Sequence, residues 1–198
     1  QALDAWVQEG VEPPPSCYGR VADGTLVDLA AMNFPALAEM PLPRLHRRPC
    51  RLDHGPDWDR GVIGAEPPGL GREYAALVPA VDADGNEVAG IRLPEAAAPL
   101  GTFVGWRLRS EALGATWAIV GLQGAWLPFA ATEADRDAGD PRSAIARRYR
   151  DRDDYVSCAK EAARGLVERR LLLARDLALV AERAGRMYDW VMAKAEQP

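Results

Sequence analysis

The spacing of apolar and polar positions divides the chain into three stretches. Residues 1–9 have the apolar spacing of an amphipathic helix, formed by Ala2, Leu3, Ala5, Trp6 and Val7. Residues 10–134 are rich in proline and glycine, and their first half predicts extended, irregular structure because proline breaks helices. From residue 135 to residue 198 the apolar period is helical again.

A hairpin is the clearest strand prediction in the middle stretch. Residues 74–78 run into the turn dipeptide Asp84-Gly85, and residues 87–91 follow it as a second strand. Residues 102–108 alternate weakly and predict one more strand, with a further short element at 117–120. The middle stretch is therefore expected to hold a small sheet that contains a hairpin.

The last stretch predicts a helical hairpin. Asp140 followed by Pro141 opens a short helix that runs to about Tyr149, and Asp151 or Asp153 caps the next helix. Two apolar stripes follow, the first made of Tyr155, Ala159, Ala162, Ala163, Leu166 and Val167, the second of Leu177, Val180, Ala181, Ala184, Tyr188 and Val191. The whole pattern predicts an α+β fold in one structural unit, with a helix at the start and a helical hairpin at the end.

Composition and charge exclude several classes of protein. Lys and Arg number 24 against 29 Asp and Glu, a formal charge of −5 that argues against nonspecific binding to nucleic acid or to an anionic membrane. No apolar run approaches the roughly 18 to 20 residues of a membrane span, so a soluble protein is expected. The scattered Cys17, Cys50 and Cys158 favour a reducing, cytoplasmic compartment over a disulfide framework and leave the compartment open. Neither a metal site nor another cofactor is expected.

Candidate nucleophiles are few. Serine hydrolases of the α/β type carry G-x-S-x-G, and glycines of that kind flank none of the serines in the chain, which are Ser16, Ser110, Ser143 and Ser157. Ser157 and Lys160 spell S-x-x-K, but an amphipathic helix explains both residues as part of a solvated face. No self-contained catalytic triad is therefore expected.

The two histidines give weak indications of chemistry. His54 lies between Asp53 and Gly55, and a carboxylate-paired histidine is able to act as a general base. A surface-loop histidine is the simpler interpretation, because the sequence offers no nucleophile for it to activate. His46 lies in a basic patch that either meets an anionic group or is solvated.

Asp82, Asp84 and Asn86 resemble the first half of a calcium-binding loop. The second half of the pattern is missing, because Gly85 is the fourth residue instead of the sixth and Leu93 occupies the twelfth position in place of glutamate. A turn rich in turn-forming residues is the expected structure.

A series of motifs along nearly the whole chain suggests one known family. The early motifs are Ala-Leu-Asp-Ala-Trp-Val at 2–7, Pro-Pro-Pro-Ser at 13–16 and Ala-Asp-Gly-Thr-Leu-Val at 22–27. The later ones are Leu-Val-Pro at 77–79, Val-Asp-Ala-Asp-Gly-Asn-Glu-Val-Ala-Gly-Ile-Arg-Leu-Pro-Glu at 81–95, Pro-Leu-Gly-Thr at 99–102, Gly-Trp at 105–106 and Leu-Pro-Phe-Ala at 127–130. With the helical tail, they resemble the C-terminal part of a bacterial family, the alpha/beta hydrolase domain proteins.

The resemblance implies a reaction and a partner. In that family the nucleophilic serine and the catalytic histidine would lie upstream of the helix at residues 1–9, so this chain is expected to hold no catalytic residue and to be inactive alone. The helix would complete an upstream hydrolase core, residues 10–134 would form a β-rich extension, and residues 135–198 a helical tail. The implied chemistry is hydrolysis of a small-molecule ester or amide through an acyl-enzyme. The uncapped helical pattern at Gln1 agrees with a chain cut from a longer one, although tag removal explains it equally well.

Four residues are candidates for the rim of a substrate pocket. The resemblance suggests Arg92, Thr102 and Trp106, and Trp126 joins them as a large aromatic residue between strand-like segments. Two alternatives stay open beside the hydrolase fragment: a non-catalytic binding or interaction module, and a stand-alone enzyme that uses Ser157 with Lys160 or the His54 loop. The fragment hypothesis predicts an unusually apolar surface where the upstream polypeptide packs.

Overall fold

A computed structural model of the chain describes residues 1–44 and 48–195, so His46 lies outside the described residues. The α-helices are α1 (Ala2–Glu9), α2 (Pro94–Ala97), α3 (Ile145–Arg148), α4 (Arg152–Glu168) and α5 (Leu177–Ala195). The strands are β1 (Leu26–Asp28), β2 (Cys50–Asp53), β3 (Gly69–Glu73), β4 (Leu77–Pro79), β5 (Gly101–Val104) and β6 (Ala125–Pro128). The predicted mixed α+β fold is confirmed, including the helix at the start of the chain.

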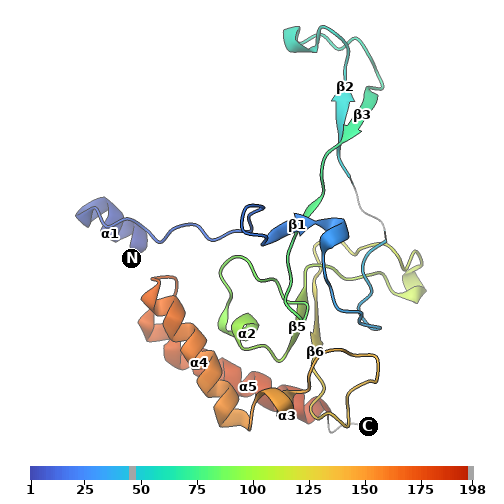
Figure 1. Cartoon of the computed structure of the whole chain (residues 1–198). Helices are drawn as coiled ribbons and strands as arrows, with labels where there is room; N and C mark the ends of the chain where they lie inside the picture. The colour runs from blue at the N-terminus through green and yellow to red at the C-terminus, as the bar shows by residue number, and fades with distance from the viewer. Residues whose placement is uncertain (45–47, 196–198) are drawn as a thin grey trace.

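The strands form three separate antiparallel pairs instead of one sheet (Figure 1). β5 pairs with β6 and places Thr102 opposite Leu127. β1 pairs with β4, and β2 pairs with β3 in a register that sets Leu52 opposite Leu70. Because pairs of this size are marginally stable in water, each must gain stability from what packs on it.

The core lies where the α4–α5 hairpin packs against β5, β6 and the short helices (Figure 1). α4 begins at Asp151, whose side chain accepts a hydrogen bond from the Asp154 amide. Its buried side chains are Tyr155, Ala159, Ala163 and Leu166, all within the stripe that the sequence predicts. The helical hairpin at the end of the chain is thus confirmed. None of the described helices is both long and apolar enough to cross a membrane.

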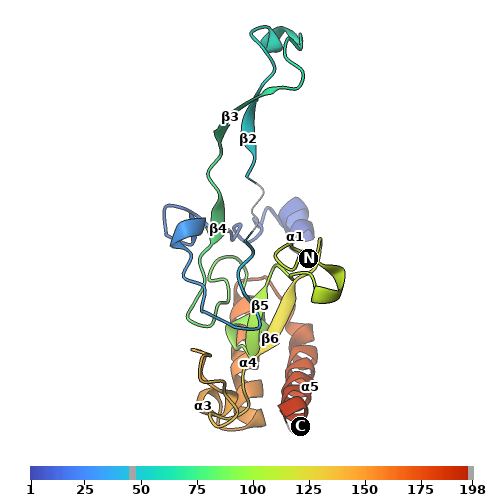
Figure 2. The same cartoon turned by 90° about the vertical axis from the view of Figure 1, so that its right-hand side faces the viewer.

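Two parts of the chain stand away from this core (Figures 1 and 2). One is α1, which has no buried residue and ends at Gly10 in the left-handed conformation. The other, which we call the arm, comprises the described residues 48–73, with β2 and β3 as its shaft. Both extensions leave large apolar side chains in solvent.

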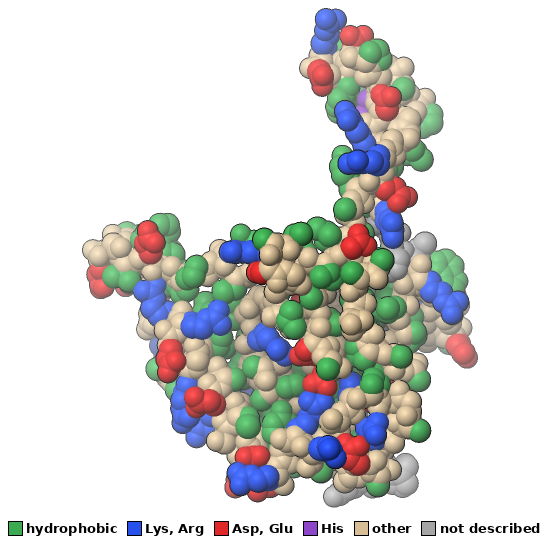
Figure 3. All heavy atoms as spheres, viewed as in Figure 1, with side chains coloured by type: hydrophobic (Ala, Val, Ile, Leu, Met, Phe, Trp, Pro, Cys, Tyr) green, Lys and Arg blue, Asp and Glu red, His purple; other side chains and the backbone are tan. Residues whose placement is uncertain are grey.

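The solvent-accessible surface of the chain is far larger than that of a compact monomer of the same mass. The accessible area is 13719 Å², whereas a compact monomer of 21.5 kDa exposes about 9,200 Å². Leu3 and Val7 of α1 are 69% and 76% exposed, and Leu70 of the arm is 80% exposed. Hydrophobic side chains reach the surface over α1, the arm and the side of the body between them (Figure 3). Large apolar side chains are thus exposed on both extensions.

The middle stretch differs from its prediction in strand partners. The predicted hairpin has its turn, closed by the bridge between Val81 and Glu87, but β4 pairs with β1 instead of with residues 87–91. Residues 117–120 contribute one bridge, between Leu108 and Ile119. The helix expected directly after Pro141 begins only at Ile145, because Asp140 turns the backbone toward Arg142 first.

Candidate functional site

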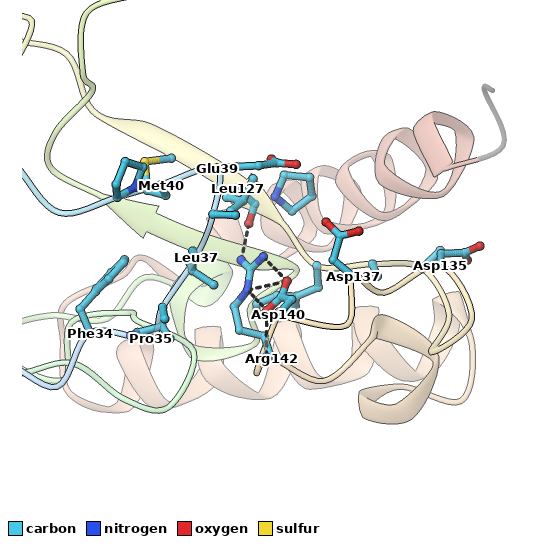
Figure 4. A pocket seen from close by; sticks show the side chains of 18 of the residues that line it. Phe34, Pro35, Leu37, Glu39, Met40, Leu127, Asp135, Asp137, Asp140 and Arg142 are labelled. Carbon is cyan, nitrogen blue, oxygen red and sulfur yellow. Dashed lines mark hydrogen bonds and ion pairs between the residues drawn. The ribbon is translucent and has the colours of Figure 1, made fainter. Parts of the chain in front are cut away.

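A groove with a volume of about 1060 Å³ opens between residues 34–42, the end of β6, the loop at 135–142 and the end of α5 (Figure 4). Phe34, Leu37 and Met40 supply an apolar wall, and Phe129 and Val191 line the body side. The carboxylates of Glu39, Asp135 and Asp137 belong to its exposed rim. The groove therefore combines an apolar lining with an acidic edge.

Arg142 lies at the base of this groove and is only 4% exposed. Its Nη2 donates to Asp140 Oδ2 at 2.6 Å, and its Nε donates to Asp140 Oδ1 at 2.9 Å. Its Nη1 donates to Thr102 Oγ1 at 2.9 Å and to the Leu127 carbonyl at 3.1 Å. One buried guanidinium thus joins the 135–142 loop to both strands of the β5–β6 pair. Figure 4 shows Arg142 together with Asp140 and Leu127.

Asp140 is held in its ionised form. Burial alone would raise the pKa of its carboxyl, but hydrogen bonds from the Arg142 side chain and amide outweigh that effect and lower the pKa below its ordinary value. A carboxylate stabilised in this way is a poor proton acceptor at neutral pH. The pair is suited to holding the groove in shape and not to acid–base chemistry.

The turn at 82–86 supports the base of the groove from behind. The Asp84 carbonyl accepts a hydrogen bond from Thr102 Oγ1 at 2.5 Å. Asn86 is 2% exposed; its Nδ2 donates to the Gly101 carbonyl at 3.2 Å, and its Oδ1 accepts from the Phe103 amide at 2.8 Å. The Asn86 side chain therefore pairs with the free edge of β5 as a neighbouring strand would.

The carboxylates of this turn already have protein partners. Asp82 accepts hydrogen bonds from Arg92 Nη2 at 3.0 Å and from the Asn86 amide at 3.0 Å. Both oxygens of Asp84 accept from the Arg148 guanidinium. In the part of the chain that the structure describes, no group of three or more His, Cys, Asp or Glu is arranged to hold a metal ion.

Trp106 fixes the wall of the groove. Its Nε1 donates to the Pro41 carbonyl at 3.3 Å, and its ring meets Phe34 edge-on with 5.1 Å between the centroids. Pro41 and Phe34 both belong to the wall. Since residues 34–42 contain no strand, this contact substitutes for backbone pairing as the link to the body.

The four predicted rim residues do not gather at one place. Thr102 and Trp106 lie behind the groove, where they hold Arg142 and the wall. Arg92 lines a second, smaller cavity of about 320 Å³. Trp126 packs between Phe103 and Trp190, and its Nε1 is buried without a partner among the described residues.

Sequence reasoning missed the residues at the base of the groove. Neither Arg142 nor Asp140 is among the candidates that the sequence suggests, although Asp140 next to Pro141 predicts a helix cap. The capping prediction is wrong, because α3 begins at Ile145 with Ala144 as its N-cap; the Asp140 side chain instead accepts from the Arg142 amide at 2.9 Å in the turn before that helix.

The alternative catalytic candidates lie apart from the groove and lack partners. Ser157 is exposed on α4, and within the described residues no hydrogen bond joins its side chain to Lys160. His54 lies in the arm and stacks on Trp58 with 4.3 Å between the ring centroids. No described side chain forms a hydrogen bond or ion pair with the His54 ring, so nothing orients it as a base.

The chain is similar to a known protein family. A family model described as an alpha/beta hydrolase domain matches residues 1–182. Neither the curated proteins nor the solved structures give a match.

Proposed function

Because the chain belongs to the alpha/beta hydrolase domain family, we propose that it is the C-terminal part of a serine-type ester or amide hydrolase. The nucleophile and its histidine lie on an upstream polypeptide, either of the same gene product or on a second chain. This chain supplies a structural extension and one side of the substrate pocket. In such an enzyme the serine hydroxyl attacks the carbonyl carbon, the alcohol or amine leaves, and water then releases the acyl group.

The observation that carries the proposal is the excess of exposed surface. The accessible area of 13719 Å² exceeds that of a compact monomer by about 4,500 Å², more than the roughly 800 Å² that one partner loses in an ordinary interface. Leu3, Trp6 and Val7 form an apolar surface on α1 that no described residue covers. Packing against an upstream hydrolase core would remove this surface from water.

The groove is the proposed contribution to the pocket. Its apolar wall accommodates the hydrocarbon part of a substrate. The three carboxylates of Glu39, Asp135 and Asp137 outnumber Lys194, the one exposed cation among the described residues of the lining, and disfavour anionic substrates. Neutral or cationic esters and amides are thus the favoured substrate class. Thr102 and Trp106 act as supporting residues, Arg92 lines the separate smaller cavity, and Trp126 packs between Phe103 and Trp190.

A fluorophosphonate probe, which labels activated serines covalently, tests this proposal. The sample is the chain purified together with its upstream polypeptide, and the readout is the intact mass of each species or of each proteolytic half. We expect the label on the upstream part alone, and nitrophenyl ester hydrolysis only when both parts are present.

The opposite result is equally clear. Label on this chain, or ester turnover by this chain alone that disappears in Ser157→Ala, would overturn the proposal. Ser110→Ala is the matched control, because Ser110 is exposed as Ser157 is and has no lysine one helical turn away. Absence of labelling anywhere in the complete protein would remove the hydrolase function altogether.

A further inference from the structure

The arm presents strand edges that no described residue covers. All residues of β3 are exposed, and in β2 only Cys50 is partly buried. Within the described chain, β2 pairs only with β3, so the outer edge of each strand is unpaired. A two-stranded ladder in water is marginally stable, and an unpaired edge is ready to accept another strand.

The edge of β2 is complementary to itself. Consider a second copy of β2 that lies antiparallel beside the first, with Leu52 opposite Leu52. Arg51 of each copy then lies opposite Asp53 of the other copy. Side chains alternate along a strand, so Arg51 and Asp53 share one face and both charge pairs form there. Opposite charges directly across an antiparallel pair are stabilising.

Both charged residues are available for such pairing. Arg51 is exposed and has no ion pair among the described residues. Asp53 is exposed, and its Oδ1 accepts a hydrogen bond from the Gly55 amide at 2.9 Å, which leaves Oδ2 free.

The opposite face of the same arrangement is apolar. Leu52 is 47% exposed and Leu70 is 80% exposed, and the two residues face each other across the β2–β3 pair. Pairing of two copies through β2 would place the leucines in one continuous row, in the order Leu70, Leu52, Leu52 of the copy, Leu70 of the copy. In that row each Leu52 side chain contacts the Leu52 of the copy, a contact that removes apolar surface from water and that the single arm lacks.

The edge of β3 is less suitable. It contains Gly69 and Gly71, which weaken a strand, and its register with β2 shifts between Cys50 and Leu52. Its Glu73 is also within ion-pair distance of Arg48, at 3.8 Å.

From these features we propose that two copies of the protein associate through antiparallel pairing of β2 with β2 about Leu52. The product is a four-stranded sheet in the order β3, β2, β2, β3, with two-fold symmetry. The same edge serves both copies, so the contact closes on itself and does not propagate into a fibre. Because β2 has only four residues, the dimer should dissociate on dilution.

Light scattering coupled to size exclusion tests the proposal on the complete protein over a series of concentrations. The wild type should approach twice the monomer mass as concentration rises. Arg51→Asp places two like-charged pairs across the two-fold axis and should abolish the dimer, as should Asp53→Arg. The double variant Arg51→Asp, Asp53→Arg restores opposite charges and should restore the dimer. Arg60→Asp at the arm tip is the matched control and should leave the mass unchanged.

A wild type that stays monomeric at every concentration would overturn the proposal, as would a dimer that survives Arg51→Asp. Loss of the dimer in Arg51→Asp without recovery in the double variant would do so as well. Fluorophosphonate labelling of the same samples keeps this outcome separate from the proposed hydrolase function, because none of these substitutions touches the groove.

Cross-linking tests the register. In a background in which Cys17, Cys50 and Cys158 are serine, Leu52→Cys places two thiols opposite each other at the axis, and oxidation should give a covalent dimer. Leu70→Cys, which is more exposed but lies on the far strand, should give little. Equal cross-linking by the two variants would indicate random collision and overturn the arrangement.

Discussion

Arg148 and Asp84 are 64 residues apart in the chain, yet the Arg148 guanidinium donates to both oxygens of the Asp84 carboxylate, with 2.7 Å between Nη1 and Oδ2. Both side chains are mostly buried, and the guanidinium also lies over the Phe129 ring at 4.1 Å from its centroid. The pair ties α3 to the turn at 82–86, and through Thr102 that turn reaches the base of the groove. The helical part and the β part of the body are joined at this point.

Arg148→Met should lower the free energy of unfolding by about 2 to 4 kcal/mol, because it leaves the Asp84 carboxylate mostly buried without its partner. Methionine keeps the apolar contact with Phe129, so the loss reports the charge pair together with the hydrogen bond from Arg148 Nε to the Ser143 carbonyl, at 2.9 Å. Urea unfolding measures it, with the exposed neighbour Arg147→Met as control. Adding Asp84→Asn to Arg148→Met should recover part of the loss; a double variant no better than the single one would contradict this explanation.

Gly101→Ala should destabilise the β5–β6 pair by about 2 to 3 kcal/mol. A Cβ at this position would lie 2.5 Å from the Leu127 carbonyl oxygen and 2.7 Å from Trp126 Nε1, and the backbone atom is unable to move aside. Gly105→Ala provides the comparison, since nothing lies within 4 Å of its Cβ position. Thermal unfolding should therefore separate the two variants, and equal melting temperatures would show that β5 relaxes freely.

Asn86→Ala should lower the free energy of unfolding by about 2 to 3 kcal/mol, since the Phe103 amide and the Gly101 carbonyl both lose their partner. Asn86→Asp keeps the acceptor for the Phe103 amide but loses the Nδ2 donor and buries a charge. We expect it to be destabilised at neutral pH and to recover as the pH falls. Chemical unfolding at two pH values measures the difference, and Asn33→Ala, at an exposed position, serves as control.

The ion pair between Asp140 and Arg142 should make the free energy of unfolding depend on pH in the acidic range. The pKa of Asp140 is lowered in the folded chain, so the unfolded state takes up the proton first as the pH falls. The stabilisation is present above the ordinary aspartate pKa of about 3.9 and is lost as the pH falls below it. Asp140→Asn lacks the carboxylate charge that Arg142 stabilises. The difference in unfolding free energy between wild type and variant should therefore shrink as the pH is lowered. A difference that is constant with pH would mean that the carboxylate charge contributes nothing.

The sequence predicts those regions well whose contacts are between residues close together in the chain. The cap and the buried stripe of α4 depend on residues within a few turns of each other. The sequence predicts Asp151 or Asp153 as the cap, of which the structure has Asp151, and the buried residues of α4 all lie in the predicted stripe. The strand that pairs with β4 was wrongly predicted. Leu77 pairs with Asp28, and the whole arm lies between these two residues in the sequence, whereas sequence spacing suggests only the segment that follows the next turn. Strand pairing over such distances is decided by packing that a single sequence does not display.

The groove escaped prediction for the same reason. Arg142 finds Thr102 and Leu127 in strands that precede it by 40 and 15 residues, and only its contact with Asp140 is local. The family motifs did identify Thr102 and Trp106, which hold Arg142 and the wall in place instead of lining the groove. The resemblance suggests Thr102 and Trp106 as contacts at a pocket rim, which stays a prediction, whereas the position of Arg142 between the strands was visible only in three dimensions.

The pairing of β1 with β4 separates the length of the arm from the structure of the body. The Leu29 amide donates to the Ala76 carbonyl at 3.2 Å directly beside that pair, so the part of the chain that carries the groove wall at 34–42 and then the arm starts and ends at the same point of the body. Loop-closure entropy grows only slowly with loop length, so insertions and deletions in the arm leave the remaining fold almost undisturbed. A change of arm length within residues 48–73 should therefore leave the groove wall at 34–42 and the helical hairpin in place.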